Sequence, residues 1–390
     1  MSGRLLFLLC GLVISLYACD TVKEEPWSNC NTAGTVIPLA ISTNDTLQLY
    51  LDSLMVMGIS TPVDYHVSEN VLYVFDSYNK RLLQYPLGRE GLIHPDSIHQ
   101  VNIKQKVSYM KYLAADSLAL YAYGTAKLSY YSLIRDTVYK SLDFINRDAP
   151  RIKGYAGSWP YANAASPIFF LGNRIVGAGF LLGENEKEYV NGRTICTQIK
   201  LPEGYITRRL PYSEVYWEHN WGGSHMRTPY ATYNEQTKQM VVSLPADHNI
   251  QVIDSNWQTK ELYAGSRTGI CITSMTLSKS DKRILDPKLA LDYYTSTPSY
   301  RNIIYDEYHD RYYRLLELPP SGKVSDRGIL KGKQASLIAF DKDFKYLGEA
   351  ALPDALALDN FFVTREGLYF LNANNKDQNI AQYVQCKIGL

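Results

Sequence analysis

The segment YWEHNWGGSHMRTPY, residues 216–230, gathers two tryptophans, two histidines, a glutamate and an arginine. Its histidines, His219 and His225, lie six positions apart, and Glu218 precedes the first of them. Zinc requires three or four converging ligands, and two histidines on a helix that share one zinc ion lie at i and i+4. The segment meets neither condition, so we expect no metal and no cofactor.

Hydrolysis is a second chemistry that residues of these types can perform. Glu218 has the chemistry of a general acid or base, but a glycosidase needs a second carboxyl group at about 5–10 Å. No local pairing supplies one, and the chain has no G-x-S-x-G nucleophile motif. A hydrolase or lyase with Glu218 or His219 in its site therefore stands as the alternative to a binding protein without catalytic activity.

Recognition of a glycan, a peptide or a protein partner fits the same residues better. Tryptophan, tyrosine and arginine dominate binding hot spots because they combine flat apolar faces with polar edges. A second long segment, 144–166, also carries such side chains. The predicted binding residues are Trp159, Tyr161, Trp217, Glu218, His219, Trp221 and Arg227. The competing interpretation is that these aromatic side chains fold back and pack over the body of the protein.

The elements that would carry these loops are β-strands in a repeat. Six polar turns are each followed by an apolar β run, at intervals of 48–70 residues. The runs begin at Ser68, Asp116, Gly172, Gln236, Asp306 and Arg365. Repeats of this kind predict an all-β fold, a β-propeller with six blades, or seven as the alternative. Loops 144–166 and 204–230 would then converge at one end of the ring.

The strands are apolar on both faces, as in VLYVFD at residues 71–76. This pattern indicates sheets covered on both sides by neighbouring blades. Asp76, Asp254 and Asp341 each follow an apolar residue at the start of a turn, where a carboxylate can accept backbone N–H bonds. We expect Arg314 to pair with an aspartate of its own hairpin.

The N-terminus predicts a lipoprotein. An apolar run after Arg4 is shorter than the ~20 residues that span a bilayer, which identifies residues 1–18 as a signal peptide. The ending Leu16-Tyr17-Ala18-Cys19 resembles a bacterial lipobox, so Cys19 is the expected lipidation site and the membrane the expected partner. Residues 19–35 would form a lipidated tether, followed by a single propeller domain at 36–390.

The net charge restricts the expected partners, and the cysteines restrict the possible disulfides. Arg4 is the only charged residue before Cys19, so cleavage leaves 39 basic and 39 acidic residues. A neutral chain without basic blocks is not expected to bind nucleic acid. Four cysteines then remain as possible disulfide partners: Cys30, Cys196, Cys271 and Cys386. A Cys30–Cys386 bridge would tie the chain ends together, whereas Cys196 and Cys271 could equally be buried thiols.

The lipobox, the tyrosine-rich strands and the unit YDEYHDRYYR resemble uncharacterised lipoproteins of gut Bacteroidetes. The group is that of the domain of unknown function 4221, similar in build to six-bladed NHL-like and TolB-like propellers. The resemblance implies a propeller over nearly the whole mature chain and brings no catalytic residues. It also implies an outer-membrane location. Lys23-Glu24-Glu25 resembles a surface-export signal, and this leaves the periplasmic face and the cell surface both open.

Overall fold

The computed structural model describes residues 25–114, 116–145, 158–180, 193–217, 219–277, 286–320 and 332–389. The predicted signal peptide, the lipidation site Cys19 and the candidate Glu218 lie outside these residues.

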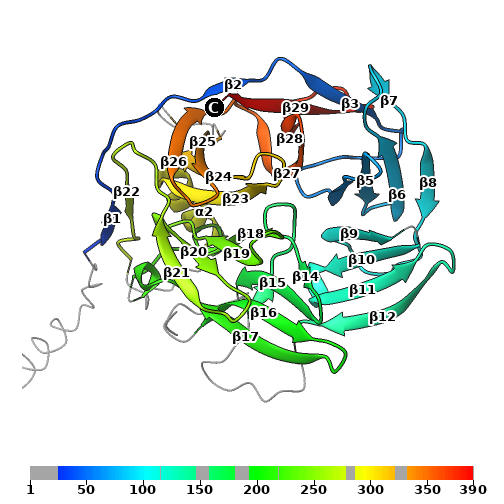
Figure 1. Cartoon of the computed structure of the whole chain (residues 1–390), viewed down its shortest axis with the longest axis horizontal. Coiled ribbons are helices and arrows are strands. Elements are labelled where there is room, and N and C mark those ends of the chain that lie inside the picture. The colour runs from blue at the N-terminus through cyan, green and yellow to red at the C-terminus, as the bar shows by residue number, and fades with distance from the viewer. Residues whose placement is uncertain are drawn as a thin grey trace, which may run out of the picture.

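Six sheets of four or more strands stand around a central axis in this part of the chain, so the predicted six-bladed propeller is confirmed (Figure 1). Blade 1 contains β4 (Val63–His66), β5 (Val71–Asp76), β6 (Arg81–Pro86) and β8 (Ser97–Gln100). Blade 2 contains β9 (Tyr109–Ala114), β10 (Ser117–Ala122), β11 (Lys127–Ser132) and β12 (Thr137–Asp143). Blade 3 contains β13 (Trp159–Pro160), β14 (Phe169–Leu171), β15 (Arg174–Phe180), β16 (Thr194–Lys200) and β17 (Tyr205–Pro211).

The other three blades complete the ring. Blade 4 contains β18 (Tyr230–Asn234), β19 (Gln239–Ser243), β20 (Asn249–Ile253) and β21 (Thr259–Tyr263). Blade 5 contains β23 (Ser299–Asp306), β24 (Arg311–Leu318), β25 (Gln334–Asp341) and β26 (Tyr346–Ala351). Blade 6 contains β27 (Leu356–Thr364), β28 (Gly367–Asn372), β29 (Ile380–Gly389), β3 (Thr46–Tyr50), β2 (Ala40–Ser42) and β7 (Leu92–Ile93). The first strands of neighbouring blades contact one another and surround the axis.

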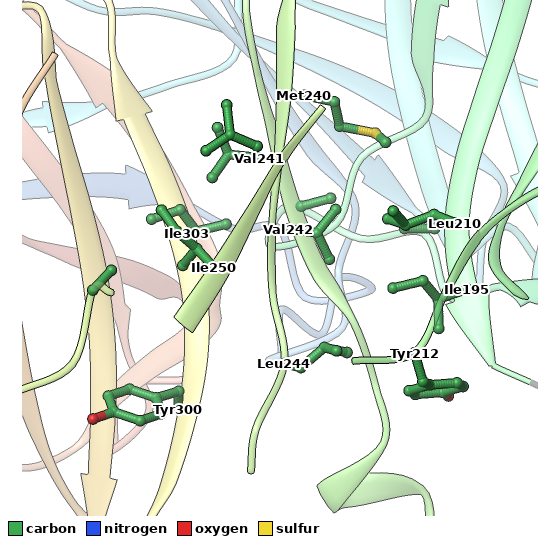
Figure 2. Close-up of a cluster of buried hydrophobic side chains, with 14 of the residues drawn as sticks. Ile195, Leu210, Tyr212, Met240, Val241, Val242, Leu244, Ile250, Tyr300 and Ile303 are labelled. Atoms are coloured by element: carbon green, nitrogen blue, oxygen red, sulfur yellow. The ribbon is translucent and has the colours of Figure 1, made fainter. Parts of the chain in front are cut away.

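Both faces of the strands are buried, as their apolar pattern predicts. On β5, Leu72 and Val74 pack with blade 6, whereas Tyr73 and Phe75 pack with blade 2. Figure 2 shows the same division around β19, where Val241 lies toward Ile303 and Val242 toward Leu210 and Ile195 of the opposite neighbour. Because each strand fills two interfaces, the alternating polar face of an ordinary two-layer sandwich is missing from the sequence.

The predicted turns have the expected structure. Each of the six repeats forms the hairpin between the first and second strands of a blade, for example β4–β5 and β27–β28. The carboxylates of Asp76, Asp254 and Asp341 accept backbone N–H bonds from residues two to four positions later. These three aspartates therefore stabilise turns, as predicted.

The ring closes through strand pairing, and the Cys30–Cys386 bridge, one of the pairings that the sequence left open, is not formed. The N-terminal strand β3 pairs antiparallel with the C-terminal strand β29 in blade 6. Cys30 instead lies on β1 (Ser28–Cys30), directly opposite Cys271 on β22 (Cys271–Thr273), and these two form the disulfide. Cys196 and Cys386 are buried free thiols. Cys30 precedes the closing strand by enough residues to reach a different blade, and for this reason it meets Cys271.

The segment predicted as a tether, residues 19–35, is partly folded. Residues 27–39, which we call the strap, run along the outside of blades 4 and 5 (Figure 1). The Asn31 side chain binds backbone atoms of Ser266, Thr268 and Ile270, and Glu349 exchanges backbone hydrogen bonds with Ile37 and Leu39. The folded domain therefore begins near Trp27 and not at residue 36.

Candidate functional site

Trp221, the centre of the predicted site, is a core residue. Its side chain is 1% exposed, and its indole N–H donates to the Val215 carbonyl at 2.9 Å. Beside it, the buried Tyr216 hydroxyl donates to the Met226 carbonyl at 2.7 Å and accepts from the Ala246 amide at 2.9 Å. The loop therefore closes on itself at these positions, which is the competing interpretation given by the sequence.

The other predicted residues of this loop lie around its rim. Trp217 is half-buried against the core of blade 4, and Arg227 is buried. His219 stacks on Trp27 of the strap, with ring centroids 4.6 Å apart and planes 6° apart. Glu218 lies outside the described residues. The structure thus shows these side chains supporting the loop and its contact with the strap.

Trp159 and Tyr161 occupy the inner edge of blade 3. The Trp159 indole N–H donates to the Tyr123 carbonyl at 2.6 Å, so this side chain ties blade 3 to blade 2. Tyr161 is half-buried, with its ring 5.3 Å from that of Tyr123 and 5.6 Å from that of Phe180. Tyr161 also lines a cavity.

The predicted loops 144–166 and 204–230 connect blades at the same end of the propeller as far as the structure describes them. Residues 146–157 lie outside the described residues, and residues 205–211 of the second predicted loop are the strand β17. Residues 144–158 join the outermost strand of blade 2 to blade 3, and residues 212–229 join blade 3 to blade 4 in the same manner. Connections of this type all emerge at one end of a ring of antiparallel four-stranded blades, together with the turns between second and third strands. We call this end the loop face.

A cavity of about 1000 Å³ opens on the loop face. It is lined by residues of segments 56–61, 76–80, 105–108, 122–125 and 161–163 and by Asp359. Tyr78, Tyr123 and Tyr161 contribute aromatic rings, and Lys80 and Lys106 contribute cations. Its size and its mixture of flat apolar and polar groups are typical of a site for a small ligand.

A cluster of charged side chains adjoins this cavity at Asp359. Arg301 donates from one nitrogen to Asp359 at 2.5 Å and from the other to Glu317 at 3.1 Å. The Tyr294 hydroxyl also donates to Glu317, and Lys333 lies 3.9 Å from the same carboxylate. Arg301 and Glu317 are largely buried, so this network is shielded from solvent screening.

The charged side chains of this cluster stabilise one another in their ionised forms. Burial by itself would raise the pKa of Glu317, but Arg301 and then Lys333 lower it on balance. Burial lowers the pKa of Lys333 to about 8, although Glu317 opposes that shift. Glu317 is therefore a carboxylate at neutral pH, and Lys333 is the member of the cluster whose pKa lies nearest physiological pH.

β-Bulges bring Arg301 and Asp359 to the axis. The register of β23 against β24 shifts between Tyr300 and Ile303, and that of β27 against β28 shifts between Ala357 and Phe361. A bulge re-aims side chains and is common at the rims of barrels and beside functional sites. The asparagine after each charged residue binds the next blade: Asn302 donates to the Leu358 carbonyl, and Asn360 donates to the Gly58 carbonyl at 3.0 Å.

Sequence reasoning missed this charge cluster. The available signal was a charged residue followed by asparagine inside an apolar strand, RN in SYRNIIYD and DN in LDNFFVT. Charged residues are rarely buried unless they are paired. The partners lie on different blades, however, and only the fold identifies them.

Two searches for other site types gave negative results. No three metal-ligating side chains come together among the residues that the structure describes. No helix within the same ranges is long and apolar enough to cross a membrane.

Comparison with known proteins agrees with this architecture. Residues 200–351 match the model of a family described as a domain of unknown function (DUF4221). The chain carries a DUF4221 match. This confirms the predicted resemblance. A DUF4221 family member from Bacteroides vulgatus has a similar fold, with a TM-score of 0.72 at 17% identity, over 90% of this chain and 99% of that one.

More distant structures share only the general fold with this propeller. A putative exported protein from Bacteroides fragilis has a TM-score of 0.47 at 10% identity, over 88% of this chain and 95% of that one. A luciferin-regenerating enzyme has a TM-score of 0.44 at 10% identity, over 89% and 96%. No curated protein matches the sequence. The Bacteroides vulgatus structure therefore supports the fold, the family match covers residues 200–351, and neither decides between binding and catalysis.

Proposed function

We propose that this protein is a lipid-anchored binding protein of the cell envelope that takes up a glycan in the cavity of the loop face. The observation that carries the proposal is the composition of that cavity. Tyr78, Tyr123 and Tyr161 offer ring faces for the apolar faces of sugars, and Lys80, Lys106 and Asp359 offer groups that bind hydroxyls. A short peptide or an envelope protein would be the other outcome of a binding screen.

Two members of the charge cluster, Arg301 and Glu317, are better suited to positioning a ligand than to proton transfer in this proposal. Glu317 has a lowered pKa, and the pKa of Arg301 is raised well above its ordinary value because its carboxylate and tyrosine neighbours outweigh burial. A general acid or base works best when its pKa lies near the working pH. Arg301 and Glu317 are therefore suited to hold Asp359 in position beside a ligand rather than to transfer protons.

The anchor is the second part of the proposal and rests on the lipobox at residues 16–19. Several acyl chains on Cys19 would hold the propeller firmly on a membrane. A Cys19→Ser variant, expressed in a bacterium that processes lipoproteins, should incorporate no labelled fatty acid. The unchanged chain should incorporate it. Equal labelling of both chains would contradict the anchor.

The first prediction concerns the cavity. The full chain in detergent is screened against an oligosaccharide array, and the best ligand is titrated by calorimetry. Tyr161→Ala should weaken binding at least about tenfold because it removes a ring from the cavity wall. Tyr205→Ala is the matched control, since this exposed tyrosine lies on the third-to-fourth strand turn of blade 3, at the opposite end.

Lys106→Ala gives a second variant in case Tyr161→Ala unfolds, because Lys106 is exposed and lines the same cavity. Unchanged affinity in a folded Tyr161→Ala protein and in Lys106→Ala would remove the cavity from the proposal. Trp221→Ala is unsuitable as a test because Trp221 belongs to the core.

A further inference from the structure

Large apolar side chains stand in solvent on the loop face. Tyr78 is 89% exposed and Val56 is 84% exposed, and Leu54 and Ile59 beside them are more than half exposed. The Asn79 side chain donates to the Leu54 carbonyl at 2.6 Å, so the 51–62 loop and the β5–β6 turn form one surface. We call Leu54, Val56, Ile59 and Tyr78 the apolar rim. Exposed apolar groups gathered in this way mark an interaction surface.

The start of the folded chain is fixed at the same end of the propeller. Trp27 and Ser274 exchange hydrogen bonds, from the Trp27 amide to the serine hydroxyl at 3.0 Å and from the Ser274 amide to the Trp27 carbonyl at 2.8 Å. The Trp27 ring stacks on His219, and the Cys30–Cys271 disulfide follows three residues later. His219 and Ser274 both belong to loops of the loop face.

The distance from this point to the predicted lipid is short. Seven residues separate Cys19 from Trp27. A fully extended chain of that length covers about 25–30 Å. A strand of eight residues, such as β24, is about 26 Å long. The opposite end of the propeller could therefore rest on the bilayer only with this linker stretched along the whole height of a blade, whereas the loop face needs no such extension.

We propose that the loop face docks on the lipid surface to which the chain is anchored, with the apolar rim at the headgroup boundary. This inference rests on the anchor at Cys19 in the proposed function. Trp27 is partly exposed at the point where the chain leaves the fold, and tryptophan favours the membrane interface. Lys104 and Lys106 are exposed on the loop before blade 2 and suit anionic headgroups. The cavity then opens toward the membrane.

The test attaches an environment-sensitive dye to a cysteine at one of two positions. Tyr78→Cys places it on the apolar rim, and Ile134→Cys places it on the β11–β12 turn at the opposite end, where Ile134 is 83% exposed. Cys196 and Cys386 are buried and Cys30 is bonded to Cys271, so the dye reacts at the introduced thiol. The lipidated full chain is inserted into phosphatidylethanolamine–phosphatidylglycerol vesicles that contain nitroxide-labelled lipid.

The nitroxide lipid should quench the dye at position 78 and leave the dye at position 134 unquenched. Equal quenching at both positions, or stronger quenching at 134, would overturn the docking. Absence of quenching at both positions would also overturn it and would favour a protein partner for this face.

A second variant distinguishes the contribution of the apolar rim from that of the lipid anchor on Cys19. Val56→Ser with Ile59→Ser, in the Tyr78→Cys protein, should lose the quenching while the protein still floats with the vesicles. Val67→Ser, at an exposed position on the β4–β5 turn of the opposite end, should leave quenching unchanged. Quenching that survives the double substitution would overturn the role of the rim. Flotation of Cys19→Ser would refute the anchor instead. Glycan binding in detergent is measured on the chain without the rim substitutions, because Val56, Ile59 and Tyr78 also line the cavity.

Discussion

Arg314 lies fully buried between blades 4 and 5 and is bound mainly by backbone oxygens. Its guanidinium donates to five carbonyls, including those of His248 at 2.8 Å and Asp247 at 2.7 Å, and lies 3.8 Å from the centre of the Tyr300 ring. The expected partners within its own hairpin were Asp306 or Asp310. Asp306 instead binds its turn and His309, and Asp310 accepts from the Tyr305 hydroxyl at 3.0 Å. Arg314 thus joins two blades, and the sequence-based prediction of a local pair was wrong.

The second prediction follows at this residue. Arg314→Met should lower the free energy of unfolding by about 3–5 kcal/mol because it leaves several buried carbonyls without a donor. Urea unfolding at neutral pH measures this change. Arg89→Met is the control, since Arg89 forms an exposed ion pair with Asp96 and should cost less than about 1 kcal/mol. Similar losses in both variants would show that the hydrogen bonds from Arg314 to the carbonyls contribute little to the free energy of unfolding.

At the scale of elements, the strap is attached to blade 4 through His248. This buried side chain lies 2.8 Å from the Tyr300 hydroxyl at Nδ1 and 3.0 Å from the Asn29 carbonyl at Nε2. Since a carbonyl only accepts, Nε2 carries the proton and Nδ1 accepts from Tyr300 in the neutral ring. A second proton on the ring would add an unsatisfied donor and a positive charge near Arg314.

The third prediction concerns pH. Burial lowers the pKa of His248, so the unfolded chain binds a proton more readily than the folded protein. The stability from this group is therefore fully present above the unfolded pKa of about 6.5 and is lost as the pH falls below it, at no more than about 1.4 kcal/mol per pH unit. Urea unfolding at several pH values between 5 and 8 measures the slope.

His248→Gln should flatten this slope, because glutamine does not titrate. Burial also lowers the pKa of His225. His225→Gln is therefore the parallel variant, and it measures how much His225 contributes to the slope. A His248→Gln protein with the same slope as the unchanged chain would contradict the role assigned to His248.

At the scale of the whole molecule, blade 6 joins the two ends of the folded chain. β3 pairs with β29 over five residues, and Leu49 on β3 is fully buried against blade 1. The five tryptophans belong to blades 3 and 4, to the loop between them and to the strap, and none lies on a strand of blade 6. Tryptophan fluorescence therefore reports on blades that do not touch the closure.

The fourth prediction uses this separation. Leu49→Ala should lower the free energy of unfolding by about 2–5 kcal/mol through the cavity that it creates. Because neighbouring blades share continuous cores, the fluorescence and circular dichroism transitions should shift together. Ile98→Ala, at an exposed position on the outer strand of blade 1, is the control and should shift neither. A fluorescence transition that stays at its original urea concentration while the dichroism shifts would show that the blades unfold separately.

Features set by neighbouring residues were readable from the sequence. The turn aspartates, the hairpin at each repeat and the burial of both strand faces depend on local backbone geometry and on a period that the chain repeats six times. The blade count followed from that period.

Pairings between distant residues were not readable. Cys30 with Cys271, Arg301 with Asp359, and Arg314 with the carbonyls of blade 4 all join segments 58 or more residues apart or on different blades. Their side chains have many chemically suitable partners in the sequence, and proximity alone selects among them. The predicted binding residues show the same limit, since Trp221 of the 216–230 segment enters the core while Tyr161 of the 144–166 segment reaches the cavity.

The sequence by itself thus determined the all-β repeat and the turn chemistry, because these are properties of short segments and of their periodicity. Only the tertiary structure decided the disulfide, the charge cluster and the cavity, because ring closure sets which blade each loop meets.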